Sequence, residues 1–213
     1  MNTKEISEKK KNLRLTTKQK EIMSGLLLGD GHLESQNNGK TYRLKVEHSI
    51  NQKDYVDWLY NIFSNWCQSE PKERIKDSFG KKITSYGFTT YSSGSFRFFA
   101  NQFYKNHQKI VPKKISHFLS LLTIAVWFMD DGSLKSDKHN NYIIHTLGFK
   151  KSECQLLVRS LLKRFKIKAT IHRQYEKYRI YIKNESANDF KKIIEPYVLD
   201  SMKYKLGNKL PKK

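Results

Sequence analysis

The segment IMSGLLLGDG at residues 22–31 is an apolar run that ends in an aspartate and a glycine. The segment LLTIAVWFMDDG at residues 121–132 has the same construction, and both runs end in Asp-Gly. Each run is long and apolar enough for a buried helix, so each acid is expected at the foot of such a helix. Two helices of this kind, packed together, bring two carboxylates side by side. That arrangement suits a divalent cation and an anionic substrate.

Positive charge is spread along the whole chain. The 213 residues include 41 lysines and arginines against 20 aspartates and glutamates, a net charge of +21. Residues 1–115 hold 21 basic and 11 acidic residues, and residues 116–213 hold 20 and 9, so neither half carries the excess alone. Hydrophobic residues make up 38% of the chain, which excludes a disordered basic tail. The pattern predicts an extended polyanion, a nucleic acid, as the partner.

The hydrophobic periodicity predicts the order helix-strand-strand-helix-strand-strand-helix twice, which is an α+β fold built from two similar halves. We expect a basic N-terminal arm at residues 1–15, a first half at 16–115 and a second half at 116–213. The strands are expected at residues 32–35, 41–48, 73–77, 82–90, 133–136, 141–147, 168–174 and 177–182.

Local signals place the ends of several helices. Thr16 and Gln19 have the spacing of a capping box for a helix from about residue 17 to residue 30. Gly31 suits the left-handed residue that follows a helix. A later helix is expected to start at Ser152, capped together with Gln155.

Small residues predict that the two apolar helices pack closely. Gly25 and Gly29 are four positions apart and therefore share one helix face, where two backbones can approach each other. Ala125 and Met129 occupy the corresponding face of the second helix. We expect the two helices to pack at the centre of the fold.

Neither cysteine usage nor hydropathy indicates export or a membrane. Cys67 and Cys154 are far apart and are expected to be reduced thiols, with no spacing that suggests zinc. The longest apolar run, residues 118–129, is too short to span a bilayer, and no signal peptide is evident. We expect an intracellular protein in the compartment of the genome that encodes it, a bacterial cytoplasm or an organelle.

An aspartate at the C-terminal end of a helix faces the negative end of the helix dipole, which is unfavourable by roughly 0.3–1 kcal/mol. Two such carboxylates also repel each other. A divalent cation removes both penalties, and few protein oxygen ligands completed by water and phosphate describe Mg²⁺, for which Mn²⁺ is expected to substitute. The expected reaction is hydrolysis of a phosphodiester.

These residues resemble the LAGLIDADG homing endonuclease family, in its single-chain form with two motifs. Residues 23–31 (MSGLLLGDG) and 124–132 (IAVWFMDDG) each match the nine-residue motif, and the resemblance covers about residues 16–210. It implies a monomer with pseudo-twofold symmetry, saddle-shaped antiparallel sheets that bind double-stranded DNA, and motif helices at the central interface. The activity implied is cleavage of both strands at a long, asymmetric site.

The resemblance also implies site residues. The acid at the eighth motif position binds metal, here Asp30 and Asp131, with Asp130 as the second choice in the second motif. A basic residue late in each half assists catalysis. Lys109 fills this place in the first half, and in the second we expect Lys205, with Lys203 as its rival. The alternative for these lysines is contact with phosphate at the surface.

A polar residue on the strand after each motif helix often orders water in this family. Glu47 is the candidate in the first half, and a cross-strand pair with Arg43 or Lys45 is the alternative role. In the second half His145 and Thr146 both remain open.

Outward-facing strand residues are expected to read base edges in the major groove. The candidates are Gln36, Arg43, Lys45, Ser85, Thr89, Arg173, Gln174, Lys177, Arg179 and Tyr181.

Two other functions fit a basic protein of this family. One is an RNA maturase, a splicing cofactor that binds intron RNA through a basic, aromatic-rich surface. The other is a catalytically inactive DNA-binding regulator. The presence of both aspartates and both lysines favours the nuclease, because neither alternative needs them.

Overall fold

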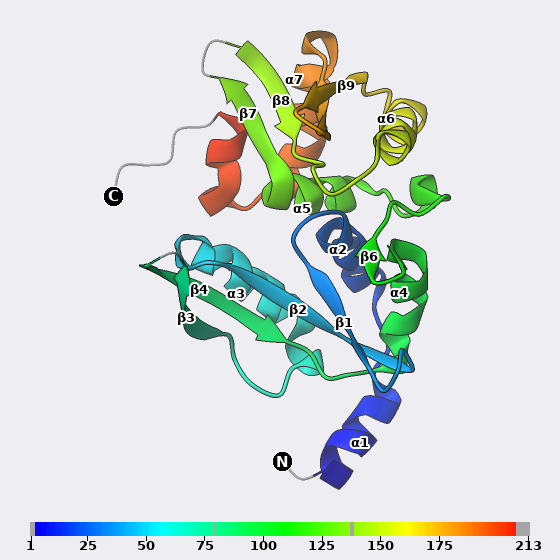
Figure 1. Ribbon diagram of the computed structural model, residues 1–213, viewed down its shortest axis with the longest axis vertical. Helices are drawn as coiled ribbons and strands as arrows, with labels where there is room; N and C mark the ends of the chain where they lie inside the picture. Colours follow the sequence, from blue (N-terminus) through cyan, green and yellow to red (C-terminus); the bar gives the residue numbers. More distant parts are fainter. Residues whose placement is uncertain (1–2, 79, 137–138, 208–213) are drawn as a thin grey trace. The chain divides into compact units, whose positions relative to one another are not determined.

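The structure is a computed structural model that describes residues 3–78, 80–136 and 139–207 (Figure 1). Its helices are α1 (Thr3–Asn12), α2 (Thr17–Leu28), α3 (Lys53–Phe63), α4 (Arg97–Phe103), α5 (Leu121–Asp131), α6 (Lys151–Phe165) and α7 (Asn184–Ile194). Its strands are β1 (His32–Gln36), β2 (Thr41–Ser49), β3 (Lys72–Ser78), β4 (Lys81–Thr89), β5 (Tyr104–Lys105), β6 (Gln108–Lys109), β7 (Gly132–Ser136), β8 (His139–Ile144), β9 (Ala169–Gln174) and β10 (Lys177–Ile182). Short 3-10 helices follow several of these elements, including one at Asp200–Leu206.

The predicted α+β fold is confirmed, and its order of elements occurs twice. One four-stranded antiparallel sheet has the strand order β1-β2-β4-β3, and the other has the order β7-β8-β10-β9. The strands lie within a few residues of their predicted positions. The arm expected before residue 16 contains the helix α1. Within the described ranges no helix is both long and apolar enough to cross a membrane.

The chain forms two compact units whose boundary differs from the predicted one. The first unit comprises Met1–Lys20 and Asp30–Ala100, and the second comprises Glu21–Gly29 and Asn101–Lys213. Most of α2 therefore belongs with the second motif helix, although it precedes the first sheet in sequence. The division into halves at residue 115 follows the repeated pattern in the sequence and stays a prediction.

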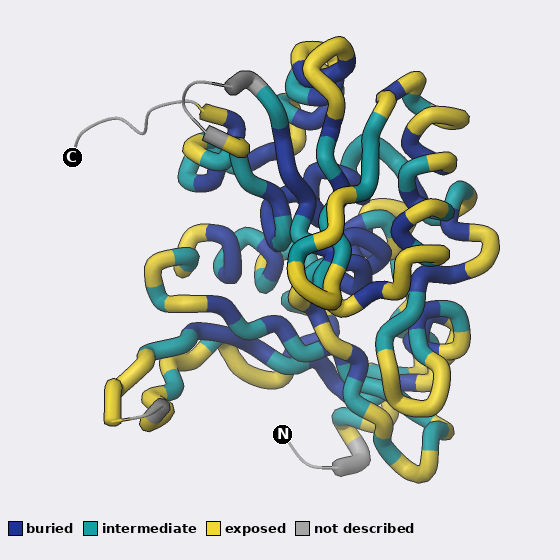
Figure 2. Tube along the Cα trace, turned by 45° about the horizontal axis from the view of Figure 1, so that its top comes forward, coloured by how far each residue is buried: buried dark blue, intermediate teal, exposed yellow. Residues whose placement is uncertain are grey.

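In the first unit α3 packs on β2 and β4. Its buried residues are Tyr55, Val56, Leu59 and Phe63, and they lie on one side of the helix because apolar residues recur at three- and four-residue intervals. Leu44, Val46 and His48 alternate with half-buried residues along β2, so one face of the sheet is buried and the other is accessible. Figure 2 shows this core as buried residues along the strands, while the tip of the β3–β4 hairpin is exposed.

In the second unit α5 is the central element. Its residues from Thr123 to Asp130 are all buried. The Phe128 ring packs edge-on against Tyr142 of β8 and Phe190 of α7, with ring centroids 5.6 Å apart in each pair. The helix α6 packs on β9 and β10 of the same sheet, on the buried face that α7 also covers. A helix buried on all sides explains why the sequence of α5 is apolar throughout rather than amphipathic.

The helix caps agree with the sequence in one case and differ in two. Thr16 Oγ1 accepts from the Gln19 N–H at 3.1 Å, and Gln19 Oε1 accepts from the Thr16 N–H at 3.0 Å, so the predicted capping box is confirmed. The prediction for α6 was wrong, because this helix begins earlier and Glu153 accepts from the Lys150 N–H at 2.7 Å. Gly31 was also misassigned, since it is not among the described residues with positive φ.

The helices α2 and α5 approach each other through two glycines, as predicted, but the α5 residues nearest these glycines are Thr123, Val126 and Asp130 rather than the predicted Ala125 and Met129. A Cβ atom on Gly25 would lie 2.7 Å from the Thr123 carbonyl oxygen and from Val126 Cβ, which is closer than real contacts allow. A Cβ atom on Gly29 would overlap the Asp130 carboxylate. Thr123 Oγ1 also donates to the Glu21 carbonyl at 3.0 Å, so a hydrogen bond joins the two helices.

We expect Gly25→Val to destabilise the protein by about 2 kcal/mol or more, because the added side chain has to separate the two helices. Urea unfolding followed by circular dichroism measures the change. Gly148→Ala is the matched control, since a Cβ atom there meets no atom within 4 Å. Equal stability of the two variants would contradict the close packing.

Candidate functional site

Lys109 lies on β6, in a short β5–β6 hairpin, and its side chain reaches the end of α2. Its Nζ donates to the carbonyl oxygen of Gly29 at 2.5 Å. The hairpin turn at Asn106 and His107 has left-handed backbone angles, and the Ile110 N–H returns to the Phe103 carbonyl at 2.8 Å. The turn thereby fixes the strand from which Lys109 extends. The ammonium group is held at the residue before Asp30.

Lys205 makes the corresponding contact with α5. Its Nζ donates to the carbonyl oxygens of Met129 at 2.5 Å and Asp130 at 2.9 Å. Its rival Lys203 instead forms an ion pair with Asp200 at 2.6 Å, three residues earlier in the same 3-10 helix. Each preferred lysine therefore binds the main chain directly before the acid to which the sequence assigned it.

These lysine contacts have two possible functions. Lysines often satisfy the last carbonyl groups of a helix and complement the negative end of its dipole, so both residues act as helix caps. The same placement puts a positive charge beside each predicted metal ligand. A capping role affects the stability of the protein, whereas a catalytic role affects the cleavage rate. Measuring both quantities on the same variant can therefore separate the two roles.

The two predicted metal ligands lie at the C-terminal ends of the motif helices. Asp30 follows α2 in a turn, and its side chain is 53% exposed. Asp131 is the last residue of α5, it is half-buried, and its carbonyl oxygen accepts from the His145 N–H at 2.9 Å. Asp130, by contrast, is buried where α5 meets Gly29. This position fits the role of a polar group at the helix end, and the choice of Asp131 over Asp130 as the metal ligand stays a prediction.

His48 is a candidate that sequence reasoning missed. It lies on the buried face of β2, and its Nδ1 is 3.7 Å from Asp30 Oδ2. Its ring packs against Tyr55 with centroids 5.1 Å apart, which limits how far the imidazole can turn. In the sequence His48 continues the alternation of Leu44 and Val46, so the pattern alone marks it as a core residue.

The strand register identifies the residues of the second sheet that correspond to Glu47 and His48 in the first. His32 and Ser133 each follow the final glycine of a motif, and they pair with Lys45 and Ile143 respectively. Counting onward from these pairs aligns Glu47 with His145 and aligns His48 with Thr146. The sequence left His145 and Thr146 open as the residue of the second half equivalent to Glu47, and the strand register favours His145.

The two positions in the second sheet differ chemically from those in the first. Thr146 Oγ1 donates to the Tyr178 carbonyl at 2.9 Å. His145 Nε2 lies 3.1 Å from Ser133 Oγ. Burial lowers the pKa of His145, and the nearby charges of Arg179 and Lys205 lower it further, which favours the neutral imidazole.

Glu47 is surrounded by donors on the accessible face of the first sheet. Its carboxylate accepts from Lys76, from Arg74 at 2.7 Å and from Ser85 Oγ at 3.0 Å. Lys45 Nζ lies 3.5 Å away. The bond from Lys76 is the largest influence that lowers the pKa of Glu47 to about 2, although partial burial opposes it. The ion pair with Lys45 is present, but Lys45 is on the same strand as Glu47, so the cross-strand partners are Arg74, Lys76 and Ser85 instead; Arg43 pairs with Glu34 at 2.6 Å.

The predicted DNA-reading residues of the first sheet share its accessible face. Residues directly opposite in an antiparallel pair lie on the same face, so the register identifies this set. It contains the predicted residues Gln36, Arg43, Lys45, Ser85 and Thr89, and it adds Arg74 and Lys76.

The second sheet requires one correction. Gln174 pairs with Lys177, His172 with Arg179 and Thr170 with Tyr181, so Gln174, Lys177, Arg179 and Tyr181 share the accessible face as predicted. Arg173 does not, because it pairs with Tyr178 on the opposite face and forms an ion pair with Glu176 at 2.6 Å. His172 joins the accessible face instead, and its ring lies 4.1 Å from that of Tyr181.

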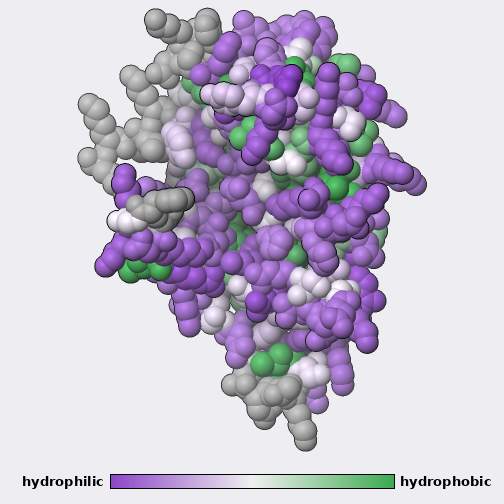
Figure 3. Space-filling model, in the orientation of Figure 1, coloured by the Kyte–Doolittle hydropathy of each residue, from purple (hydrophilic) through white to green (hydrophobic). Residues whose placement is uncertain are grey.

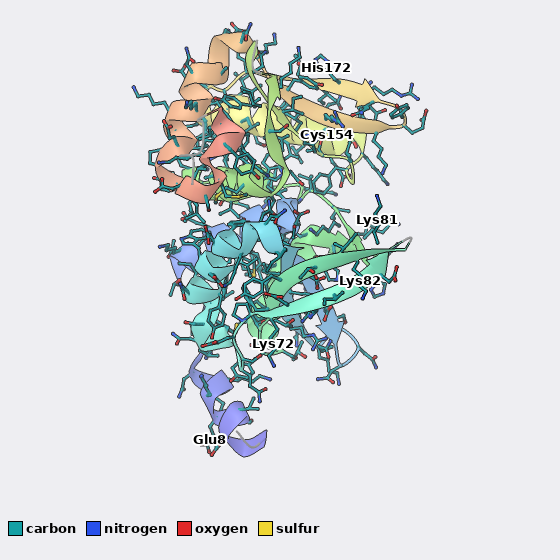
Figure 4. All side chains as sticks on the ribbon, turned by 90° about the vertical axis from the view of Figure 1, so that its left-hand side faces the viewer. Glu8, Lys72, Lys81, Lys82, Cys154 and His172 are labelled. Atoms are coloured by element: carbon teal, nitrogen blue, oxygen red, sulfur yellow. The ribbon has the colours of Figure 1, made fainter. Side chains whose placement is uncertain are left out.

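Hydrophilic residues cover most of the surface in Figure 3. Figure 4 shows Lys72, Lys81 and Lys82 along the β3–β4 hairpin, and it shows His172 on β9. Lysines and arginines thus flank both accessible sheet faces, which is the charge distribution that a polyanion requires.

Both the sequence and the structure resemble those of known proteins. The model of the LAGLIDADG DNA endonuclease family matches residues 20–190. A probable intron-encoded endonuclease 1 of Wickerhamomyces canadensis is 31% identical, over 96% of this chain and 91% of that protein. The cytochrome b mRNA maturase bI2 of Saccharomyces cerevisiae is 32% identical over 89% of this chain, which corresponds to 47% of the maturase. The structure of the homing endonuclease I-WcaI bound to its DNA recognition sequence matches with a TM-score of 0.91 and 29% identity, over 96% of this chain and 93% of that chain.

The surroundings of Glu47 predict a pH-dependent stability. The pKa of Glu47 is lowered from 4.5 to about 2, so its ionised form stabilises the fold above pH 4.5, and this stabilisation is lost as the pH falls towards 2. We expect Glu47→Gln to lower the free energy of unfolding at pH 7 by on the order of 2 kcal/mol, and we expect the difference to disappear near pH 2. Urea unfolding at stepped pH tests this, and a pH-independent difference would contradict it.

Proposed function

Because the chain belongs to the LAGLIDADG DNA endonuclease family, we propose that it is a site-specific homing endonuclease that hydrolyses both strands of a long, asymmetric DNA target with a divalent metal ion. The observation that carries the proposal is the pair of matching contacts at the motif helices. Lys109 binds the carbonyl group before Asp30, and Lys205 binds the carbonyl group before Asp131. Each predicted acid thus has an ammonium group at its own helix end.

The donor set fits Mg²⁺ as the metal. Asp30 and Asp131 each offer carboxylate oxygens, and the exposure of the Asp30 side chain leaves room for water and phosphate ligands. Mn²⁺ is expected to substitute, because it accepts the same oxygen donors. When bound, the metal activates water for attack and stabilises the leaving oxygen.

We assign the remaining roles in the reaction to residues of the chain. Asp30 and Asp131 hold metal, and each serves one strand of the target. Lys109 and Lys205 stabilise the negative charge that develops on the reacting phosphate. His48 places a ring nitrogen 3.7 Å from the Asp30 carboxylate, beside the predicted metal ligand.

DNA recognition is assigned to the accessible faces of the two sheets. Arginine on such a face recognises guanine, glutamine recognises adenine, and lysine binds phosphate. The two faces carry different residues, with Arg43 and Arg74 on the first and Arg179 and Tyr181 on the second. We therefore propose an asymmetric target, bound by a monomer that needs no second copy to supply a motif.

Substitution of either metal ligand tests the assignment. We expect Asp30→Asn and Asp131→Asn to bind the target within a few-fold of the original affinity and to lose double-strand cleavage, because the neutral amide holds a divalent cation poorly. Cleavage of a target selected from a randomised duplex library measures this. Asp130→Asn is the comparison and is expected to retain double-strand cutting; loss in that variant alone would move the site to Asp130.

Removal of the lysine charge separates catalysis from helix capping. We expect Lys109→Met and Lys205→Met each to slow single-turnover cleavage by about 100- to 1,000-fold, the usual loss when a charge-stabilising group is removed. Lys203→Met is the control, since its ammonium group pairs with Asp200. A loss of thermal stability with an unchanged cleavage rate would instead show that the lysines only cap the helices.

The spread of positive charge predicts strong salt dependence. Contact with about eight phosphates gives a slope of roughly −7 for log affinity against log salt concentration. Titrations of a labelled duplex between about 50 and 200 mM salt measure the slope. A slope near zero would contradict the proposed interface.

A second candidate function is intron splicing, and the maturase relative favours it. A splicing role needs RNA binding and does not need metal at Asp30 or Asp131. This function would be supported if the variant with both aspartates changed to asparagine stimulated splicing of the encoding intron as well as the unaltered protein does. Tight site-specific DNA binding without metal-dependent cleavage would indicate the third candidate, an inactive regulator.

A further inference from the structure

Glu47 lies at the centre of a charge cluster that joins three strands. We define the Glu47 cluster as Glu47 on β2, Arg74 and Lys76 on β3, Ser85 on β4 and Lys45 on β2. The Glu47 side chain is 15% exposed, whereas Arg74 is 41% exposed and Lys76 is 59% exposed. The acid is therefore set below the cations that it holds. The cluster lies wholly in the first unit and on the accessible face of its sheet.

The donors around Glu47 leave little capacity for a catalytic water. An ionised carboxylate has about four acceptor positions. Arg74, Lys76 and Ser85 donate to it, and Lys45 lies at ion-pair distance. A group that orders or deprotonates water needs a lone pair directed at that water. The observed arrangement uses these lone pairs within the sheet.

The same arrangement suits recognition of bases. A guanidinium group has five N–H donors, and Arg74 donates to Glu47 through Nη1, so the fork retains donors for a guanine edge. Holding Arg74 and Lys76 in place before DNA arrives removes part of the entropy loss of binding. The buried negative charge also weakens binding to duplexes that offer no matching acceptors. Glu47 thereby lowers non-specific affinity and raises discrimination.

We propose that Glu47 is a positioning residue that sets the sequence specificity of the first sheet, by holding Arg74, Lys76 and Lys45 in the arrangement that reads the target. This inference rests on the proposed function. Its register counterpart His145 lies between Ser133 and the charges of Arg179 and Lys205. The second sheet therefore has an imidazole where the first has a carboxylate, and the effect belongs to one half of the target.

The test compares Glu47→Gln with the original protein. We expect non-specific affinity to rise about 3-fold, with a salt slope steeper by about 1, because one negative charge is removed. The ratio of specific to non-specific affinity is expected to fall about 10-fold. The cleavage rate at saturating cognate duplex is measured in parallel, because a loss of that rate with unchanged discrimination is the signature of a catalytic residue.

Selection from a randomised duplex library shows where discrimination is lost. The base pairs relaxed by Glu47→Gln should cluster in one half of the target and should coincide with those relaxed by Arg74→Met. In the double variant the two losses should not add, because both substitutions remove the same arrangement. A purely structural role would not confine the change to one half-site.

Glu73→Gln is the matched control. Glu73 is on the same strand as Arg74, pairs with Tyr86 on the opposite face of the sheet and is exposed, so its loss changes the net charge equally. It should alter non-specific affinity slightly and leave the specificity profile unchanged. Urea unfolding of each variant verifies that the proteins are folded at the assay temperature.

Each of the following results would overturn the inference. Glu47→Gln that cleaves cognate DNA slowly with unchanged discrimination would make Glu47 catalytic. Relaxation spread evenly over both half-sites, or equal relaxation in Glu73→Gln, would reduce the effect to net charge. If the unaltered protein enriches no duplex from the library, the proposed function is overturned, and this inference with it. If the unaltered protein and Glu47→Gln both enrich the same duplex with equal discrimination, this inference alone is overturned.

Discussion

The close approach of α2 and α5 is the constraint on which the candidate site depends. Side chains at Gly25 or Gly29 would overlap α5, so the approach exists only because both residues lack a Cβ atom. Since Asp30 follows Gly29 directly and Asp130 packs against it, the contact fixes where each helix ends. The strand β7 begins at Gly132, directly after α5, and β1 begins at His32, four residues after the last residue of α2.

Residues from late in the chain complete each helix end. Lys109 and Lys205 lie 79 and 74 positions beyond their aspartates, and both contact the last carbonyl groups of a motif helix. A carboxylate at the negative end of a helix dipole is unfavourable alone. An ammonium group on the neighbouring carbonyl groups offsets part of that cost. One arrangement of the lysines therefore both stabilises the helix end and places a charge for catalysis. Only a comparison of stability with cleavage rate can separate these two roles.

Much of this arrangement could be predicted from sequence because it follows local patterns. Alternation identified β2, the repeated apolar runs identified α2 and α5, and the Asp-Gly ends identified the acids. Arg173 was placed on the wrong face because strand register depends on the turn. A two-residue turn at Tyr175 and Glu176 pairs Gln174 with Lys177, so parity assigns Gln174 to the accessible face and Arg173 to the other.

His48 illustrates what local patterns cannot supply. Its position in β2 matches that of a core residue, and its relevance arises only because Asp30, 18 positions earlier, lies beside it in the folded chain. Glu47 presents the opposite case. The sequence showed an acid among basic residues on one strand, but Arg74, Lys76 and Ser85 reach it from β3 and β4. For both residues, contacts with side chains that are distant in the sequence determine the chemical environment.

The two halves share a topology but differ at equivalent positions, and this difference has a physical consequence. His48 beside Asp30 corresponds to Thr146, whose hydroxyl group is bonded to the main chain, and Glu47 corresponds to His145. A duplicated fold constrains backbone geometry, since helix packing and register must be kept for the sheets to form. It places no such constraint on the polar groups around each acid. The two acids therefore have unequal surroundings within equivalent frameworks, and the accessible faces need not favour related base sequences.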